Sequence, residues 1–358
     1  MKQLRKDYKR IVIKIGSSLL FSDKGQEYFC SFLNSLGDQV RTLWDEKNEI
    51  VLVSSGAIAF GIHELGLKQR PKELYLLQSA AAIGQNRLMD YYRKFLKTKV
   101  HVAQILLTWE DFTDKRRYTN TKNTLLSLLK LGSIHIINEN DTVSTDEIRF
   151  GDNDRLSALV ASLVSADLLI ILSDVDGLLD REKKVVRVVP EITSQIKELA
   201  CPTLKKTCVG GMITKIEAAK IAVDSGIPCV IANGRNPDII LRILKESDLM
   251  GNWTLFLPKK GYLAARKRWI AFSAKPKGKI FVDEGAKKAL LNKKSLLSVG
   301  VTGVEGNFES LDIVSIVDAQ GNEFARGKTC ISCAQLDKVK GMRFEKEIVH
   351  CDNIVVFI

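Results

Sequence analysis

The sequence predicts an α/β fold with an open, mostly parallel sheet sandwiched by helices, followed by a small β-rich barrel. Two observations predict it. Up to about residue 250, short apolar runs alternate with longer segments of helical spacing, which is typical of βαβ units. Beyond that point the apolar runs are closely spaced and separated by glycines, which is typical of a small β-barrel.

Six apolar runs predict strands buried on both faces of a parallel sheet, because they are short, continuous and rich in β-branched residues. In chain order they are 11–15, 50–53, 102–107, 134–137, 168–172 and 229–232. Helical spacing predicts helices over 73–96, 120–131, 154–165 and 214–226, the last with Gly226 at its C-terminal cap. This alternation predicts helices on both faces of the sheet.

A basic linker at 259–269, KKGYLAARKRW, indicates a domain boundary. We therefore expect a catalytic domain over 1–258 and a second domain over 270–358. Residues 251–358 hold 18 basic and 11 acidic residues, so this part is more basic per residue than the rest of a chain whose net charge is +12. This basic composition is expected of a surface that binds RNA, and it is equally expected of an ordinary solvated surface.

The composition argues against a membrane protein and against a disulfide scaffold. No run approaches the roughly 18 apolar residues of a membrane span, and a charged N-terminus leads directly into the first strand. We therefore expect a cytoplasmic protein with no membrane partner. The seven cysteines are odd in number and mostly scattered. Cys330 and Cys333 form a lone C-x-x-C, a weak zinc signal, so we assign no metal ligands.

Polar loops follow several of the predicted strands. Because ligands of open α/β sheets bind outside the carboxyl ends of the strands, these loops predict one shared site. Lys14 and Gly16 lie at the end of the first strand, where a lysine is costly to bury without a partner such as a phosphate. Ser54, Ser55 and Gly56 precede a helix whose N–H groups can bind an anion, although the segment also fits a plain turn.

The loop after strand 134–137 is dense in asparagine and aspartate: Asn138, Asn140, Asp141, Asp152, Asn153 and Asp154. These residues are common in turns, but their amides and carboxylates can also hold an amino acid. An aspartate between two lysines can fix the positions of both. Asp154 is in addition predicted to cap the helix that follows.

A glycine turn begins the last predicted helix of this part. Gly210 and Gly211 precede Thr214 and Lys215, which is typical of a phosphate-binding turn but lacks the G-x-x-x-x-G-K-[ST] spacing of a P-loop. Ser173 and Asp174 follow strand 168–172 and are expected to line a nucleotide pocket. The loops together predict a kinase that is neither a P-loop enzyme nor a protein kinase.

Residues from about 9 to 250 resemble the glutamate 5-kinase family of the amino-acid kinase superfamily. The resemblance rests on V-x-S-G-A-I, I-N-E-N-D-x-V, G-D-N-D-x-L-S-A and G-G-M-x-T-K, which are long motifs. The C-terminal segment that contains KRWIAFSAKPKGKIFVDEGAKKALL is similar to the PUA domain of bacterial members, a domain that RNA-modifying enzymes also carry.

The resemblance implies ATP-dependent phosphorylation of the γ-carboxylate of L-glutamate, the first step of proline biosynthesis. It implies that Lys14 and Lys215 stabilise the transferring group, that Asp154 orients them, and that glutamate is bound by Ser55, Asp141 and Asn153. The implied nucleotide-binding residues are Lys14, Ser173, Asp174, Val209, Gly210, Gly211, Met212, Ile213, Thr214 and Lys215. The resemblance also implies Mg²⁺, feedback inhibition by proline, and assembly as a homo-oligomer, either a dimer or a tetramer.

The glycine loop departs from the family pattern, since Cys208 and Val209 stand where a glycine and a hydroxyl residue are usual. This departure bears on nucleotide affinity. Two alternatives stay open: a superfamily relative such as a UMP, aspartate or carbamate kinase, and an RNA-binding protein with a non-catalytic kinase fold. The presence of Lys14, Lys215 and Asp154 together favours an enzyme.

Overall fold

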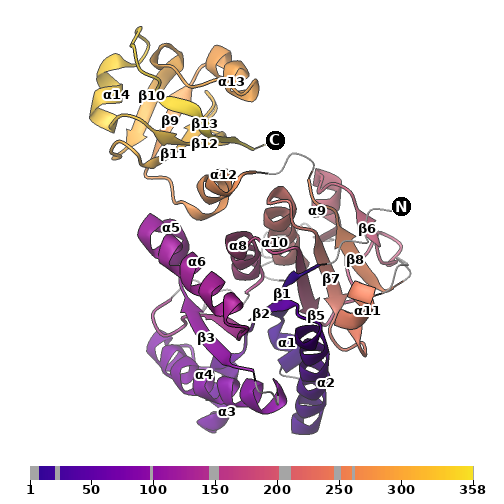
Figure 1. The fold of residues 1–358 in the computed structure, drawn as a ribbon. Helices are drawn as coiled ribbons and strands as arrows, with labels where there is room; N and C mark the ends of the chain where they lie inside the picture. Colours follow the sequence, from indigo (N-terminus) through magenta and orange to yellow (C-terminus); the bar gives the residue numbers. More distant parts are fainter. Residues whose placement is uncertain are drawn as a thin grey trace. The chain divides into compact units, whose positions relative to one another are not determined.

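The computed structural model describes residues 8–20, 25–96, 100–144, 153–200, 211–245, 251–259 and 263–357. The chain divides into two compact units, which Figure 1 shows in sequence colours. The first comprises Met1–Asp111 and Tyr118–Tyr262, and the second comprises Leu263–Ile358 with the short stretch Phe112–Arg117. Each unit has its own sheet.

The first unit is built on an eight-stranded sheet in the order β3-β4-β2-β1-β5-β7-β8-β6. Its strands are β1 (Arg10–Ile15), β2 (Glu49–Val53), β3 (Val102–Leu107), β4 (Ile134–Glu139), β5 (Leu168–Ser173), β6 (Val188–Val189), β7 (Cys229–Asn233) and β8 (Trp253–Phe256). Neighbours pair in parallel except β7 with β8. The six predicted strands are confirmed, and β1 lies inside the sheet rather than at its edge.

Helices connect these strands and cover both faces of the sheet. They are α1 (Ser17–Leu20), α2 (Gly25–Asp45), α3 (Ala57–Glu64), α4 (Leu74–Leu96), α5 (Trp109–Thr113), α6 (Lys115–Lys130), α8 (Asp154–Val164), α9 (Ser194–Ala200), α10 (Met212–Asp224) and α11 (Ile239–Lys245). Helices α8 and α10 pack against each other beside β1, β5 and β7, as Figure 1 shows. Helices α1, α2, α4 and α11 contribute to the core on the other face. None of the described helices is long and apolar enough to cross a bilayer.

The alternation of side chains along β1 determines where its lysine lies. Ile11, Ile13 and Ile15 belong to the apolar core shared with α2 and α4. Because successive strand residues point to opposite faces, Val12 and Lys14 lie on the face covered by α8 and α10. A strand that is apolar on both faces therefore carries one charged side chain beneath two helix N-termini.

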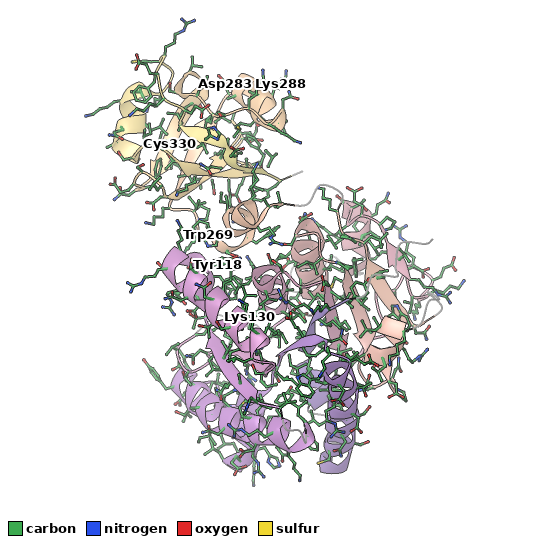
Figure 2. All side chains as sticks on the ribbon, viewed as in Figure 1. Tyr118, Lys130, Trp269, Asp283, Lys288 and Cys330 are labelled. Carbon is green, nitrogen blue, oxygen red and sulfur yellow. The ribbon has the colours of Figure 1, made fainter. Side chains whose placement is uncertain are left out.

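The second unit contains a five-stranded sheet in the order β10-β9-β11-β12-β13. Its elements are α12 (Ala265–Arg268), a π-helix (Trp269–Ser273), β9 (Gly278–Val282), α13 (Glu284–Leu291), a 3₁₀ turn (Ser298–Gly300), β10 (Val301–Gly306), β11 (Ile313–Val317), β12 (Glu323–Thr329), α14 (Cys333–Val339) and β13 (Val349–Val356). Its pairs are antiparallel except β9 with β11. Asp283 caps α13 by accepting a 2.7 Å bond from the N–H of Ala286, and Lys288 lies in the last turn (Figure 2).

Candidate active site

A buried carboxylate joins two buried lysines at the centre of the first unit. Asp154 Oδ1 lies 2.6 Å from Lys14 Nζ, and Asp154 Oδ2 lies 3.2 Å from Lys215 Nζ. Thr214 donates its hydroxyl to the same Oδ2 at 3.0 Å. Asp154 is fully buried, and Lys14 and Lys215 are 3% and 8% exposed. Four residues that were singled out in the sequence are therefore in direct contact.

Three different elements supply this cluster. Lys14 extends from β1, Asp154 is the first residue of α8, and Lys215 lies in the first turn of α10. The N-terminal end of a helix carries partial positive charge, which favours a carboxylate at this position. The prediction that Asp154 caps α8 is wrong, because Asn153 is the N-cap and makes no side-chain capping bond. The Asp154 side chain is turned instead toward the lysines.

Among the described residues, one buried carboxylate faces two buried ammonium groups, so the described part of the cluster carries a surplus positive charge. Burying an uncompensated charge is costly unless a counter-ion binds there. The arrangement therefore suits an anion with several oxygens, and the transferring phosphoryl group of ATP is such an anion.

A second group of buried polar side chains adjoins the cluster. Asn153 donates to the backbone oxygen of Ser54 at 2.6 Å and to Asn138 Oδ1 at 2.7 Å. Ser55 Oγ and Asn153 Oδ1 are buried with no hydrogen-bond partner among the residues that the structure describes. Buried polar atoms are normally satisfied, so these two atoms indicate a polar ligand. Gly56, with φ of 99°, makes the sharp turn from Ser55 into α3.

Asp141 lies in the turn that follows β4 and is 6% exposed. The turn is closed by backbone bonds from Val143 and Ser144 to the oxygen of Asn140. Asp141 therefore lies two residues beyond the end of β4, the strand that carries Asn138. The structure does not describe Asp152, the remaining candidate of this loop.

Ser173 and Asp174 lie at the end of β5, next to the end of β1. Gly16 donates its N–H to Leu172 O at 3.0 Å, and Ser173 donates to Asp174 Oδ1 at 3.1 Å. Burial raises the pKa of Asp174, but hydrogen bonds from its own backbone, Ser173 and Ser18 together with the charge of Arg235 lower it overall. Arg235 and Ser18 therefore act on Asp174 and belong to the same side of the expected nucleotide pocket.

The sequence analysis missed the loop that contains Arg235. It follows β7 as Asn233-Gly234-Arg235, and Gly234 donates its N–H to Ser173 O at 2.8 Å. The sequence could have revealed this loop, because it is polar and follows a buried apolar strand, as the other loops of the site do. It adds a cationic side chain at the same edge of the sheet.

The glycine turn is described only in part. Gly211, with φ of 87° and ψ of −137°, precedes α10 in a conformation that only glycine adopts readily. Met212 and Ile213 are half-buried in the first turn of α10, and Lys215 also donates to Gly211 O at 3.3 Å. Val209, Gly210 and the unusual Cys208 lie outside the described residues.

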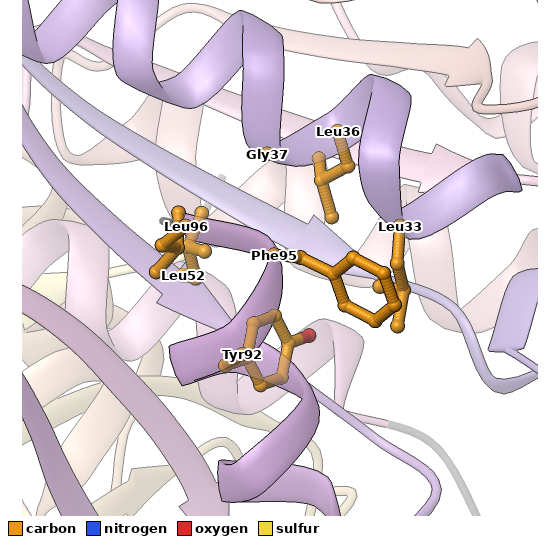
Figure 3. Close-up of a pocket in the computed structure, with 7 residues that line it drawn as sticks. All are labelled: Leu33, Leu36, Gly37, Leu52, Tyr92, Phe95 and Leu96. Atoms are coloured by element: carbon orange, nitrogen blue, oxygen red, sulfur yellow. The ribbon is translucent and has the colours of Figure 1, made fainter. Parts of the chain in front are cut away.

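An apolar cavity lies behind the serine loop (residues 54–56), on the other face of the sheet (Figure 3). It is lined by Leu33, Leu36, Gly37, Leu52, Tyr92, Phe95 and Leu96. The Tyr92 hydroxyl is 2.8 Å from Ser54 Oγ, and burial raises the Tyr92 pKa. The cavity has no charged lining and does not suit a phosphate or an amino acid, whereas Tyr92 supports the serine loop from behind.

A separate cluster in the second unit has metal-ligating side chains. His350, Cys351 and Asp352 offer ligand atoms within 4.8 Å of one another. Cys330 and Cys333, the C-x-x-C pair, do not belong to this group, and Cys333 donates Sγ–H to Gly306 O at 3.2 Å.

The fold and the site define a kinase of the amino acid kinase family, to which this chain belongs: residues 9–233 match that family, and residues 278–351 match the PUA domain. Curated relatives over nearly the full length carry the name glutamate 5-kinase. The protein from Thermoanaerobacter sp. (strain X514) is 44% identical over 97% of each chain. The protein from Syntrophotalea carbinolica is 43% identical over 99% of each. Within the family, the chain is therefore a member of the glutamate 5-kinase group.

Two solved structures also match part of the chain. A UMP kinase from Bacillus anthracis has a TM-score of 0.46 and 18% identity, over 71% of this chain and 98% of that one. A carbamate kinase from Giardia lamblia has a TM-score of 0.48 and 16% identity, over 71% of this chain and 99% of that one.

Proposed function

We propose that this protein transfers the γ-phosphoryl group of ATP to the γ-carboxylate of L-glutamate, giving L-glutamyl 5-phosphate for proline synthesis. The observation that carries this proposal is the buried cluster of two lysines on one aspartate, beside buried polar atoms that lack a partner among the described residues. The first group suits phosphoryl transfer and the second suits an amino acid. The full-length similarity to proteins named glutamate 5-kinase supports the same acceptor.

Each residue has a role in this proposal. Lys14 and Lys215 stabilise the negative charge that spreads over the transferring group, and Asp154 holds both ammonium groups in place. Ser55, Asp141 and Asn153 bind glutamate. The nucleotide lies against Ser173, Asp174 and the first turn of α10, where Gly211, Met212, Ile213 and Thr214 lie, with Val209 and Gly210 just before them.

Magnesium fits this site as a partner of the nucleotide. The Asp154 carboxylate is already engaged by two lysines and a threonine, so it is poorly placed to serve as a metal ligand. Mg²⁺ is usually held largely by substrate phosphates and water, and it supplies charge neutralisation on the phosphate oxygens. Mg²⁺ bound to the phosphates of ATP would neutralise part of their charge, and Lys14 and Lys215 would supply further positive charge to the transferring group.

The test is ATP consumption with glutamate, aspartate, N-acetylglutamate, carbamate and UMP as separate acceptors. We expect turnover with glutamate alone, with the labile acyl phosphate trapped as a hydroxamate by hydroxylamine. Turnover with UMP, or with another acceptor in preference to glutamate, would assign the site to a different member of the superfamily. Absence of turnover with every acceptor would favour a non-catalytic kinase fold.

Four further proposals rest on the resemblance to the family. The enzyme is cytoplasmic, assembles as a homo-oligomer, is inhibited by proline, and binds RNA through its basic C-terminal region. Light scattering measures the assembly, and added proline in the kinase assay measures the inhibition. For RNA, a mobility shift at two salt concentrations is informative, because phosphate contacts give an affinity that falls steeply with salt.

A further inference from the structure

A chain of buried hydrogen bonds runs from helix α4 to the proposed glutamate site. Gln85, 7% exposed on α4, accepts a 3.0 Å bond at Oε1 from Asn138 Nδ2. Asn138 Oδ1 accepts from the N–H of Glu139 at 2.9 Å and from Asn153 Nδ2 at 2.7 Å. Asn153 Nδ2 also donates to the backbone oxygen of Ser54 at 2.6 Å. Asn138 and Asn153 are fully buried.

Two backbone groups set the direction of the bonds in this chain: the N–H of Glu139, which bonds Asn138, and the carbonyl of Ser54, which bonds Asn153. The N–H of Glu139 can only donate, so the oxygen of Asn138 must face it. The amide NH₂ of Asn138 is thereby directed to Gln85, whose oxygen accepts it. The carbonyl of Ser54 can only accept, so the NH₂ of Asn153 must face it.

Asn153 therefore has a single orientation. Both hydrogens of its NH₂ group are used, one by Ser54 and one by Asn138. Its remaining polar atom, Oδ1, is a buried acceptor with no partner among the described residues. An acceptor of this kind complements an ammonium group and disfavours a carboxylate.

We propose that Gln85 is a positioning residue for substrate recognition: it holds Asn138, and through it Asn153, so that Asn153 presents only its carbonyl oxygen to the α-ammonium of the substrate. The inference rests on the proposed function, because it assumes that an amino acid occupies this site. Without Gln85, the N–H of Glu139 still sets which way the Asn138 amide faces, but the Asn138 NH₂ group loses the acceptor that holds it, so Asn138 and the Asn153 bonded to it are held less firmly in position.

The Gln85 side chain itself argues against a purely structural role. Its Nε2 atom is buried with no partner among the described residues. An unsatisfied buried donor is unfavourable, and an apolar side chain of the same length would avoid it. The glutamine at this position is explained by the hydrogen bond that its Oε1 atom accepts from Asn138.

The experiment compares the KM for glutamate and the KM for ATP in the full-length enzyme and in Gln85→Met, which keeps the length of the side chain and removes its acceptor. We expect the KM for glutamate to rise about tenfold, which is the size of one lost positioning hydrogen bond, with the KM for ATP nearly unchanged. Circular dichroism must show that the variant is fully folded under the assay conditions, because a partly populated competent state by itself raises an apparent KM. If Gln85→Met gives no folded enzyme, the shorter Gln85→Asn removes the same contact.

Two other variants separate this role from general packing. Gln78→Met makes the same change on the same helix, at a half-buried position outside the chain of bonds, and should leave both KM values unchanged. Gln85→Glu keeps an acceptor oxygen and should keep the KM for glutamate within about threefold of the parent, less than the effect of losing the bond. An increase in Gln85→Glu as large as in Gln85→Met would overturn the role of the acceptor.

The substrate analogue glutarate, which lacks the ammonium group, provides a readout that packing defects would not move. We expect the parent enzyme to prefer glutamate over glutarate, and Gln85→Met to lose most of that preference. An unchanged preference, or equal KM values in Gln85→Met and Gln78→Met, would refute the positioning role. A parent enzyme that does not turn over glutamate would instead refute the proposed function, so the two failures are distinguishable.

Discussion

At the scale of single residues, the site depends on where charge is placed and left unbalanced. Lys14 is the one buried charged residue of the strand Arg-Ile-Val-Ile-Lys-Ile, whose first residue Arg10 is half-buried, and it meets its counter-charge 140 residues later in the sequence. Asp154 divides its charge between two lysines, so each ammonium group keeps the capacity to attract a phosphate oxygen.

The first prediction concerns the two lysines. Lys14→Ala and Lys215→Ala should each lower kcat about 10²–10³-fold while the fold is kept, because each removes a charge that acts most strongly on the transition state. Steady-state kinetics measures kcat, and circular dichroism verifies folding. Lys220→Ala, on the same helix α10 and paired with Asp224 at 2.7 Å, is the control and should remain active. Near-normal turnover in a folded Lys14 or Lys215 variant would contradict the assigned role.

The sequence was enough to predict the residues that take part in the chemistry, but it was not enough to predict the residues that hold them in place. Lys14 is recognisable because a charge in a buried strand is costly, and Asp154 and Lys215 are recognisable because they follow a polar loop and a glycine turn. Gln85 and Tyr92 were missed, since a glutamine and a tyrosine within an amphipathic helix have no sequence signal that separates them from ordinary positions. Their roles arise only when α4 is packed behind the loops.

At the scale of elements, helices α3 and α4 approach each other through glycines. A Cβ atom on Gly84 would lie 1.9 Å from the oxygen of Ala57, and one on Gly61 would lie 1.7 Å from the oxygen of Ala80. Both distances are far below van der Waals contact, so the two backbones can lie this close only without side chains. Ala57 follows the serine loop directly, which connects this packing to the proposed glutamate site.

The second prediction follows from this contact. Gly84→Ala should destabilise the protein by about 1–3 kcal/mol through overpacking, and it should raise the KM for glutamate because α3 must move together with Ser55. Urea unfolding and glutamate titrations measure the two effects. Gly303→Ala is the control, since its Cβ would meet its nearest atom at an ordinary 3.5 Å. A Gly84→Ala variant as stable as Gly303→Ala would show that the helices separate without strain.

The third prediction concerns strand β4 and the histidine buried in it. Burial lowers the pKa of His135 to about 4 from its ordinary 6.5. Between these values the unfolded chain binds the proton and the folded chain does not, so stability is lost as the pH falls from about 6.5 to about 4. The total loss is roughly 3 kcal/mol, at about 1.4 kcal/mol for each unit of pKa.

The measurement for His135 is urea unfolding of the parent and of His135→Asn between pH 7.5 and pH 4.5. The parent should be more stable at the upper end, and its advantage should shrink toward the lower end because asparagine does not titrate. His101→Asn, at an exposed position, controls for the loss of a surface histidine. A difference between the parent and His135→Asn that stays constant across this range would contradict the prediction.

At the scale of the whole molecule, the sequence predicted most strands of the large sheet but not β8 and β6, which form one of its edges. Five of the six predicted strands are buried, and they were found because parallel strands covered on both faces are continuous apolar runs; β3, at the edge of the sheet, is mostly half-buried, so the expected burial on both faces is wrong for it. The two-residue β6 is too short to give a pattern. Strand β8 was not among the predicted strands, and its antiparallel pairing with β7 depends on the path of the chain between them, which has no local signature.

The last prediction is that the first unit is catalytically self-sufficient. We propose a catalytic domain over residues 1–258 and a PUA-like domain over 270–358, and every proposed site residue lies at or before Arg235. A chain ended after Tyr262 keeps β8 and two backbone bonds that hold the segment after it, Leu257 N to Val189 O and Lys259 N to Val223 O, both 3.0 Å. It should fold and phosphorylate glutamate with a kcat of the same order as the full chain.

Kinetics and circular dichroism of the shortened chain test this prediction, with the full-length protein as the reference and residues 263–358 alone as the inactive control. Some loss of stability is expected, because Phe112–Arg117 groups with the second unit and would lose its neighbours there. A shortened protein that is folded but shows no glutamate-dependent ATP turnover would mean that the C-terminal unit completes the active site, directly or by building the oligomer. A shortened protein that turns over glutamate but has lost inhibition by proline would instead locate the contribution of that unit in regulation.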